Sequence, residues 1–141
     1  MIERSAAERF IDDYRSAFLR FDAGAVARFF AFPCQVTSDA ETVTVTSVAT
    51  VEAWIPQIER IIGAYRALGV TDAVADSHCL DITPRLAQAV VRWSLSDGRG
   101  DPVYEFDASY ALADFGDGMR ITAVAHNEGP RLRAALARRQ G

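Results

Sequence analysis

The sequence predicts an α+β domain in which three helices from the N-terminal half cover one face of a long, curved antiparallel sheet. Apolar residues recur at helical spacing over 5–21 and 51–68, whereas four strand patterns follow between residues 73 and 128. The connections between these strands are short, which favours antiparallel neighbours. The 141 residues, half of them hydrophobic, fit a single domain, 1–141, with an ordinary core.

The first predicted helix spans residues 5–21. Ser5 and Glu8 have the spacing of a capping box, and the apolar positions that follow are Phe10, Ile11, Tyr14, Ala17, Phe18 and Phe21. Asp22 can cap a second, shorter helix that carries Val26, Phe29 and Phe30. This second helix must end before Pro33, because the residue that precedes a proline avoids helical geometry.

A small β-hairpin and a third helix come next. The segments 34–38 and 42–47 are short and rich in β-branched residues, which predicts two paired strands. Residues 51–68 return to helical spacing and end at Gly69, which can adopt the left-handed conformation of a helix cap. Pro56 either kinks this helix or marks the start of its regular part.

The second half predicts a meander of strands at 73–83, 86–96, 103–114 and 119–128. Alternation along the second and third of these strands gives an apolar row that should face the helices: Ala87, Ala89, Val91, Trp93, Leu95, Tyr104, Phe106, Ala108, Tyr110 and Leu112. On the opposite face, Arg92 should pair across the strands with Glu105 or Asp107. Residues 130–141 predict a short terminal helix that carries four arginines and no acid.

Composition and charge exclude several classes of function. The net charge is −4, and the acidic body outside 130–141 disfavours nucleic-acid binding. No stretch is long and apolar enough to suggest a membrane span, and a cytoplasmic location is expected. Cys34 and Cys79 are expected to be free thiols. No metal site is expected, because His78 and Cys79 are adjacent on a strand and point to opposite faces.

The order of elements resembles the NTF2-like superfamily, also called SnoaL-like or cystatin-like, whose sheet forms a cone. The resemblance covers nearly the whole chain and is clearest in the segments 10–14, 21–26 and 118–121. It implies a homodimer formed through the outer sheet face. Members of the superfamily include isomerases, dehydratases, cyclases and noncatalytic binding modules, so the fold alone does not select a reaction.

A cone of this kind should enclose a cavity with aromatic walls and few charges, suited to a small apolar or aromatic molecule. The residues expected to line it are Phe18, Phe30, Trp54, Ile58, Trp93, Tyr104, Tyr110 and His126. The alternative is that these rings simply fill the core. His126 lies near the end of the last strand, where a polar residue at the cavity mouth or on the surface is expected.

The best acid/base candidates in the sequence are His78, Asp76 and Tyr14. If Leu80 and Ile82 point inward, His78 and Asp76 on the same strand face do so too. His78 could then act as base or acid, with Asp76 orienting its ring and Tyr14 donating a hydrogen bond.

The ketosteroid isomerase branch of the superfamily offers a sharper comparison. Its helical tyrosine corresponds to Tyr14, but its base corresponds to Ser38 and its second acid to Ala108. Asp39 and Asp107 are each one residue away, and a slip of one residue on a strand turns a side chain to the other face. Isomerase chemistry is therefore disfavoured.

The sequence thus favours a cavity that binds a small apolar or aromatic molecule without a cofactor. One alternative is a cofactor-independent acid/base enzyme of the cyclase, isomerase or dehydratase kind. Another is a noncatalytic dimerisation or partner-binding module.

Overall fold

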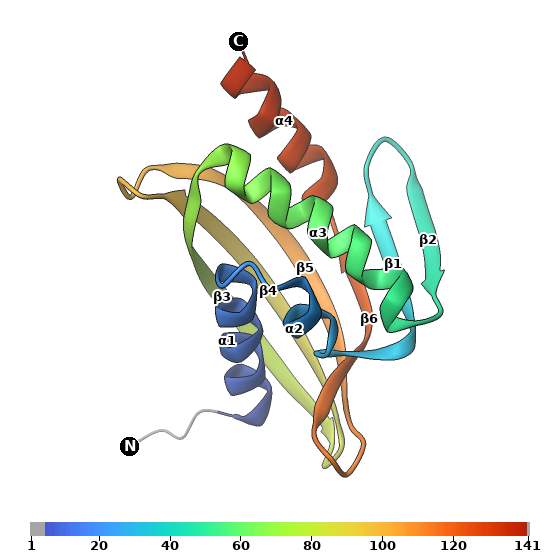
Figure 1. Cartoon of the computed structure of the whole chain (residues 1–141). Helices are drawn as coiled ribbons and strands as arrows, with labels where there is room; N and C mark the ends of the chain where they lie inside the picture. Colours follow the sequence, from blue (N-terminus) through green and yellow to red (C-terminus); the bar gives the residue numbers. More distant parts are fainter. Residues whose placement is uncertain (1–4, 141) are drawn as a thin grey trace, which may run out of the picture.

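The computed structural model describes residues 5–140. In this part of the chain the helices are α1 (Ala6–Leu19), α2 (Ala23–Ala27), α3 (Val51–Leu68) and α4 (Glu128–Gln140), and the strands are β1 (Phe30–Asp39), β2 (Val43–Val48), β3 (Val70–Thr83), β4 (Leu86–Asp97), β5 (Pro102–Asp114) and β6 (Met119–His126). The strands form one six-stranded sheet in the order β2-β1-β6-β5-β4-β3 (Figure 1). The α+β class is confirmed.

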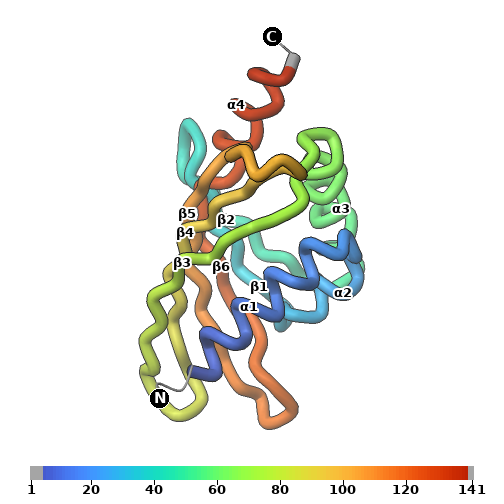
Figure 2. Tube along the Cα trace, turned by 90° about the vertical axis from the view of Figure 1, so that its left-hand side faces the viewer, coloured from blue at the N-terminus to red at the C-terminus, as the bar shows by residue number. Residues whose placement is uncertain are grey.

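The sheet is mostly antiparallel, as predicted, but β1 and β6 pair in parallel. That parallel pair places the N-terminal hairpin beside the last strand of the meander and completes the curved sheet. Figure 2 shows α1, α2 and α3 on one side of the sheet, with α4 projecting from one end.

Both N-terminal helices begin at the predicted caps. The Ser5 hydroxyl accepts from the Glu8 backbone N–H at 3.1 Å, and the Asp22 carboxylate accepts from Ala25 N–H at 3.0 Å. The prediction that α2 reaches Phe30 is wrong, because α2 ends at Ala27 and Phe30 begins β1. Pairing with β6 decides this: Ile121 N–H donates to the carbonyl oxygen of Phe29 at 2.8 Å, which draws the segment into the sheet.

Helix α3 has the predicted ends. Thr50 caps its start, where the side-chain oxygen accepts from Ala53 N–H at 3.1 Å, and Gly69 ends it with a φ of 73°, which favours glycine. Pro56 lies within the helix, which begins five residues earlier at Val51 and continues past it. The buried side of α3, formed by Trp54, Ile58, Ile62, Tyr65 and Leu68, closes over the sheet.

The inner row predicted for β4 and β5 is confirmed, since all ten of its residues are buried. Arg92 pairs on the outer face with Glu105 at 3.1 Å and Asp107 at 3.0 Å, as predicted. The same face leaves several large apolar side chains of β3 and β4 exposed: Val74, Leu80, Ile82, Leu86 and Val90. Within residues 5–140, no helix has the length and apolar character needed to cross a membrane.

Candidate functional site

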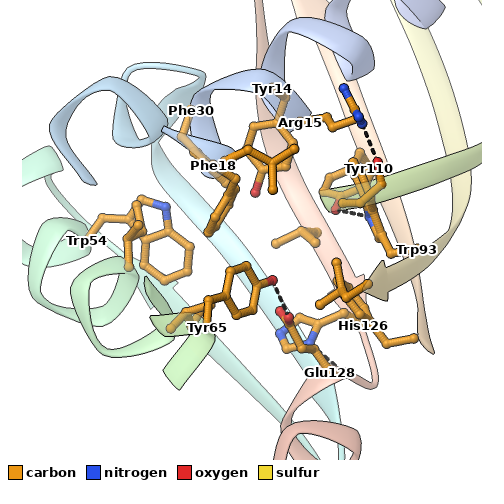
Figure 3. A pocket seen from close by; sticks show the side chains of 17 residues that line it. Tyr14, Arg15, Phe18, Phe30, Trp54, Tyr65, Trp93, Tyr110, His126 and Glu128 are labelled. Carbon is orange, nitrogen blue, oxygen red and sulfur yellow. Dashed lines mark hydrogen bonds between the residues drawn. The ribbon is translucent and has the colours of Figure 1, made fainter. Parts of the chain in front are cut away.

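A cavity of about 70 Å³ lies between the concave face of the sheet and the helices. Eight aromatic side chains line it: Tyr14, Phe18, Phe30, Trp54, Tyr65, Trp93, Phe106 and Tyr110. They come from α1, α3, β1, β4 and β5, so that residues far apart in the sequence face one another (Figure 3). The inward alternation of the strands and the buried faces of the helices together produce this enclosure.

The rings hold one another through edge contacts. The Tyr14 ring lies 5.3 Å from Phe18 and 5.8 Å from Tyr110 between centroids, both close to T-shaped, and Phe30 meets Trp54 at 5.4 Å. Trp93 donates its indole N–H to the Tyr110 hydroxyl at 3.0 Å. The wall is therefore largely apolar and fixed by packing.

Glu128, the first residue of α4, carries a buried carboxyl group in the cavity wall. Glu128 is the one buried acidic or basic residue among those that the structure describes, with 9% of its surface exposed. The hydroxyls of Tyr65 and Tyr104 both donate to Oε2 at 2.7 Å. Oε1 has no hydrogen-bond partner among the described residues. One carboxylate oxygen is therefore saturated and the other is open.

Two opposing effects act on this carboxyl group. Burial raises the pKa of Glu128, because the charged form loses water, whereas the hydrogen bonds from Tyr65 and Tyr104 lower it. Burial and the nearby carboxylate raise the pKa of both phenols well above their usual range. The tyrosines therefore remain protonated donors across the physiological range.

His126 also faces the cavity, from the end of β6. Its Nδ1 accepts from the backbone N–H of Glu128 at 3.1 Å, which favours the neutral tautomer with its proton on Nε2. Burial lowers the pKa of His126 below its usual 6.5. The imidazole is therefore a neutral polar group beside the acidic one.

Seven of the eight residues predicted to line a pocket lie on this cavity: Phe18, Phe30, Trp54, Ile58, Trp93, Tyr110 and His126. Tyr104 is buried behind the wall and contributes its hydrogen bond to Glu128. Tyr14, predicted as a hydrogen-bond donor, lines the cavity, and its hydroxyl has no hydrogen-bond partner among the described residues. The indole nitrogen of Trp54 is fully buried and unpaired.

The predicted inward orientation of His78 and Asp76 is wrong. Their side chains are 84% and 74% exposed, and His78 Nε2 lies 4.0 Å from Asp76 Oδ1. The register explains the error: His78 pairs with Val90 and Asp76 with Arg92, two outward residues of β4. The apolar Leu80 and Ile82, expected to point inward, are exposed on the same outer face.

The aspartates near the isomerase positions also lie outside the cavity. Asp39 is exposed at the end of β1, and Asp107 pairs with Arg92 on the outer face. Cys34 and Cys79 are free thiols. Within the described residues, no three His, Cys, Asp or Glu side chains are grouped as they would be to hold a metal ion.

Sequence reasoning missed Glu128. It placed this residue at the end of the last strand and began the terminal helix at Pro130, whereas α4 begins at Glu128. An acidic residue two positions before a helix-starting proline is typical of a first helical turn, and this signal could have moved the boundary. Nothing in the sequence indicated that Tyr65 and Tyr104 would meet there.

A curved sheet closed by three helices around an aromatic cavity with one buried carboxyl group defines a cone-shaped, NTF2-like domain. Residues 3–129 match the family described as NTF2-like protein (DUF6841). The chain belongs to this NTF2-like family. No curated protein matches the chain in sequence.

Solved structures share this fold at low identity. An NTF2-like protein of unknown function from Shewanella oneidensis is 13% identical, with a TM-score of 0.69 over 86% of this chain and 96% of its own. An NTF2-like protein with a cystatin-like fold from Novosphingobium aromaticivorans is 14% identical, with a TM-score of 0.67 over 93% and 86%. The protein Aln2 from a Streptomyces species is 13% identical, with a TM-score of 0.66 over 96% and 93%. The TM-scores show a shared fold, and at these identities the likeness extends to the fold alone.

Proposed function

We propose that the domain binds a small apolar or aromatic molecule inside the cone. The observation that carries this proposal is the cavity wall, in which eight aromatic side chains surround an open space. Apolar walls with a few placed polar groups are typical of small-molecule sites. Here Glu128, His126 and the Tyr14 hydroxyl are the polar groups that would orient the ligand.

The size of the cavity restricts the ligand. Its volume of about 70 Å³ is well below the roughly 300–1,000 Å³ of pockets that enclose drug-sized molecules. The proposed ligand is therefore no larger than one ring with a short substituent. Several side chains of the wall are only half-buried, among them Phe18, Leu19 and Ile61, and entry of the ligand would require some of them to move aside.

Tryptophan fluorescence tests the proposal, because both tryptophans of the chain, Trp54 and Trp93, line the cavity. Titration with benzyl alcohol should give a saturable change in emission. Val124→Phe, which fills the cavity, should abolish it, whereas Val90→Phe on the outer face should not. A linear, unsaturable response in the wild-type protein, or an unchanged affinity in Val124→Phe, would contradict binding in the cone.

A second candidate function is a cofactor-independent acid/base enzyme, and the buried Glu128 is the observation that favours it. A carboxyl group with a raised pKa in an apolar cavity can exchange a proton with a carbon acid, and the free Tyr14 hydroxyl could stabilise the enolate oxygen. His78 and Asp76 are not part of this proposal, because both are on the outer face.

Exchange of α-hydrogens of cyclopentanone for deuterium, followed by NMR, tests this second function. Wild-type protein should accelerate exchange over buffer, and Glu128→Gln should lose the acceleration. Absence of any acceleration by the wild-type protein would remove the candidate.

We also propose that a second copy of the chain covers the outer sheet face. The exposed apolar side chains of β3 and β4 would be buried, and the face carries both signs of charge in Arg92, Glu105 and Asp107, which suits self-pairing about a twofold axis. Sedimentation equilibrium should show a dimer that Val90→Arg dissociates, whereas Val43→Arg, on the distant strand β2, leaves it intact. A monomeric wild-type protein would exclude this arrangement.

A further inference from the structure

The cavity contains one acidic side chain whose charge is not matched by a base. Glu128 is the acid, and its Oε2 is saturated by two phenols, while Oε1 has no partner among residues 5–140. Among residues 5–140, Trp54 Nε1 is the one side-chain nitrogen or oxygen that is both unpaired and fully sealed off. Because Glu128 Oε1 is unpaired but is not sealed off in this way, it retains access to open space. Figure 3 shows the Glu128 carboxyl at the edge of the space that the rings surround.

The basic side chains that line this cavity do not neutralise Glu128. Arg15 reaches the cavity wall, but its guanidinium pairs with Asp72 at 2.8 Å and donates to the carbonyl oxygen of Ala73. His126 is held as a neutral tautomer by the backbone N–H of Glu128, and burial lowers its pKa. Among the described residues that line the cavity, no free cation faces Glu128.

An unmatched buried carboxylate is costly, and a cationic ligand would remove that cost. Burial raises the pKa of Glu128, and the two phenols partly offset this by each donating a hydrogen bond to Oε2, which favours the ionised form. A cation beside Oε1 would favour the ionised form further. The rings of Tyr14, Phe18 and Trp93 line the same space, and the negative π-face of an aromatic ring attracts ammonium groups. Acid and rings therefore select the same sign of ligand charge.

We propose that the ligand is a small organic ammonium ion, whose cationic nitrogen pairs with Glu128 Oε1 and whose apolar part fills the aromatic cavity. This inference rests on the proposed binding function and adds the charge and chemical class of the ligand. It excludes carboxylates, which would meet Glu128 with like charge, and it ranks neutral alcohols of the same shape below amines.

Three ligands of one shape and different charge test the proposal: benzylamine, which is an ammonium ion at pH 7, benzyl alcohol and benzoate. Tryptophan fluorescence of the wild-type protein should give an affinity for benzylamine at least tenfold higher than for benzyl alcohol, with benzoate weakest. In Glu128→Gln the affinities for benzylamine and benzyl alcohol should differ by less than about twofold, because the charge that favours the ammonium ion has been removed. The amide preserves an acceptor for Tyr65 and Tyr104 and removes the charge.

The outcomes distinguish the ammonium assignment from the binding function on which it rests. Binding of benzyl alcohol that equals or exceeds that of benzylamine overturns the ammonium assignment and leaves the binding function standing. Failure of all three ligands to bind overturns both. The comparison of benzylamine with benzyl alcohol in the wild-type protein tests the ammonium assignment even if Glu128→Gln does not fold. If Glu128→Gln folds and still prefers benzylamine, the assignment is also overturned.

Discussion

Substitution of Tyr104 by Phe isolates one of the two hydrogen bonds that hold Glu128. The phenol donates to Oε2 at 2.7 Å, and the ring is almost fully buried, so the change removes one oxygen atom and leaves the packing in place. A hydrogen bond to a charged group contributes about 1.5–3 kcal/mol, against roughly 0.5–1.5 kcal/mol for a neutral pair. Tyr104→Phe should therefore cost about 2 kcal/mol when Glu128 is ionised, and less when it is protonated.

The same substitution should show a characteristic dependence on pH. Burial raises the pKa of Glu128 in the folded state and the Tyr104 hydrogen bond partly offsets that rise. The charged component of this hydrogen bond is present while Glu128 is ionised and is lost as pH falls through the folded pKa. Unfolding entropies near 2.1 cal/mol/K per residue convert about 2 kcal/mol into a decrease in Tm of about 7 °C for this length. The decrease should be smaller at pH 4 than at pH 7.

Calorimetry or circular dichroism across this pH range measures the effect, and Tyr110→Phe is the matched control. Tyr110 accepts a neutral hydrogen bond from Trp93 at 3.0 Å, so its loss should be near 1 kcal/mol and independent of pH between 4 and 7. If Tyr104→Phe and Tyr110→Phe have equal costs with equal pH dependence, the charged network around Glu128 does not exist as described.

Three other substitutions have definite expected results. Leu112→Ala, at a core position that is 2% exposed, should lower the free energy of unfolding by about 2–5 kcal/mol in chemical denaturation; a loss under about 1 kcal/mol would contradict the close packing there. Glu128→Gln should gain stability relative to wild type as pH rises above about 4.3, the ordinary glutamate pKa. Because burial raises the folded pKa of Glu128, ionisation of the carboxyl group destabilises the folded wild-type protein progressively until the pH reaches that folded pKa. A stability difference that does not change with pH would refute this. His78→Ala should leave the benzyl alcohol affinity unchanged, since the side chain is 84% exposed on the outer face, away from the cavity; a loss of affinity would place His78 in the site.

Most of the helices and strands could be predicted from local sequence patterns. The caps at Ser5, Asp22 and Thr50, the left-handed Gly69 and the alternation of β4 and β5 act over a few residues and are legible in one sequence. The parallel pairing of β1 with β6 joins segments about 90 residues apart, and no local pattern encodes it. That long-range pairing also explains why Phe30 belongs to a strand.

The site could be predicted only in part, for a related reason. Aromatic residues on inward faces were visible, and most of them line the cavity. The face of β3 was misassigned because its exposed residues Leu80 and Ile82 are as apolar as core residues, so alternation alone could not decide the direction. The network at Glu128 depends on α3, β5 and α4 meeting at one point, which only the tertiary structure specifies.

The most direct test of the central claim is a crystal structure of the wild-type protein soaked with benzylamine at neutral pH. We expect density for the ring between Tyr14, Trp54 and Trp93, with the ligand nitrogen within hydrogen-bond distance of Glu128 Oε1. A cavity that stays closed around its own side chains, with the amine absent or bound on the outer face, would contradict the claim.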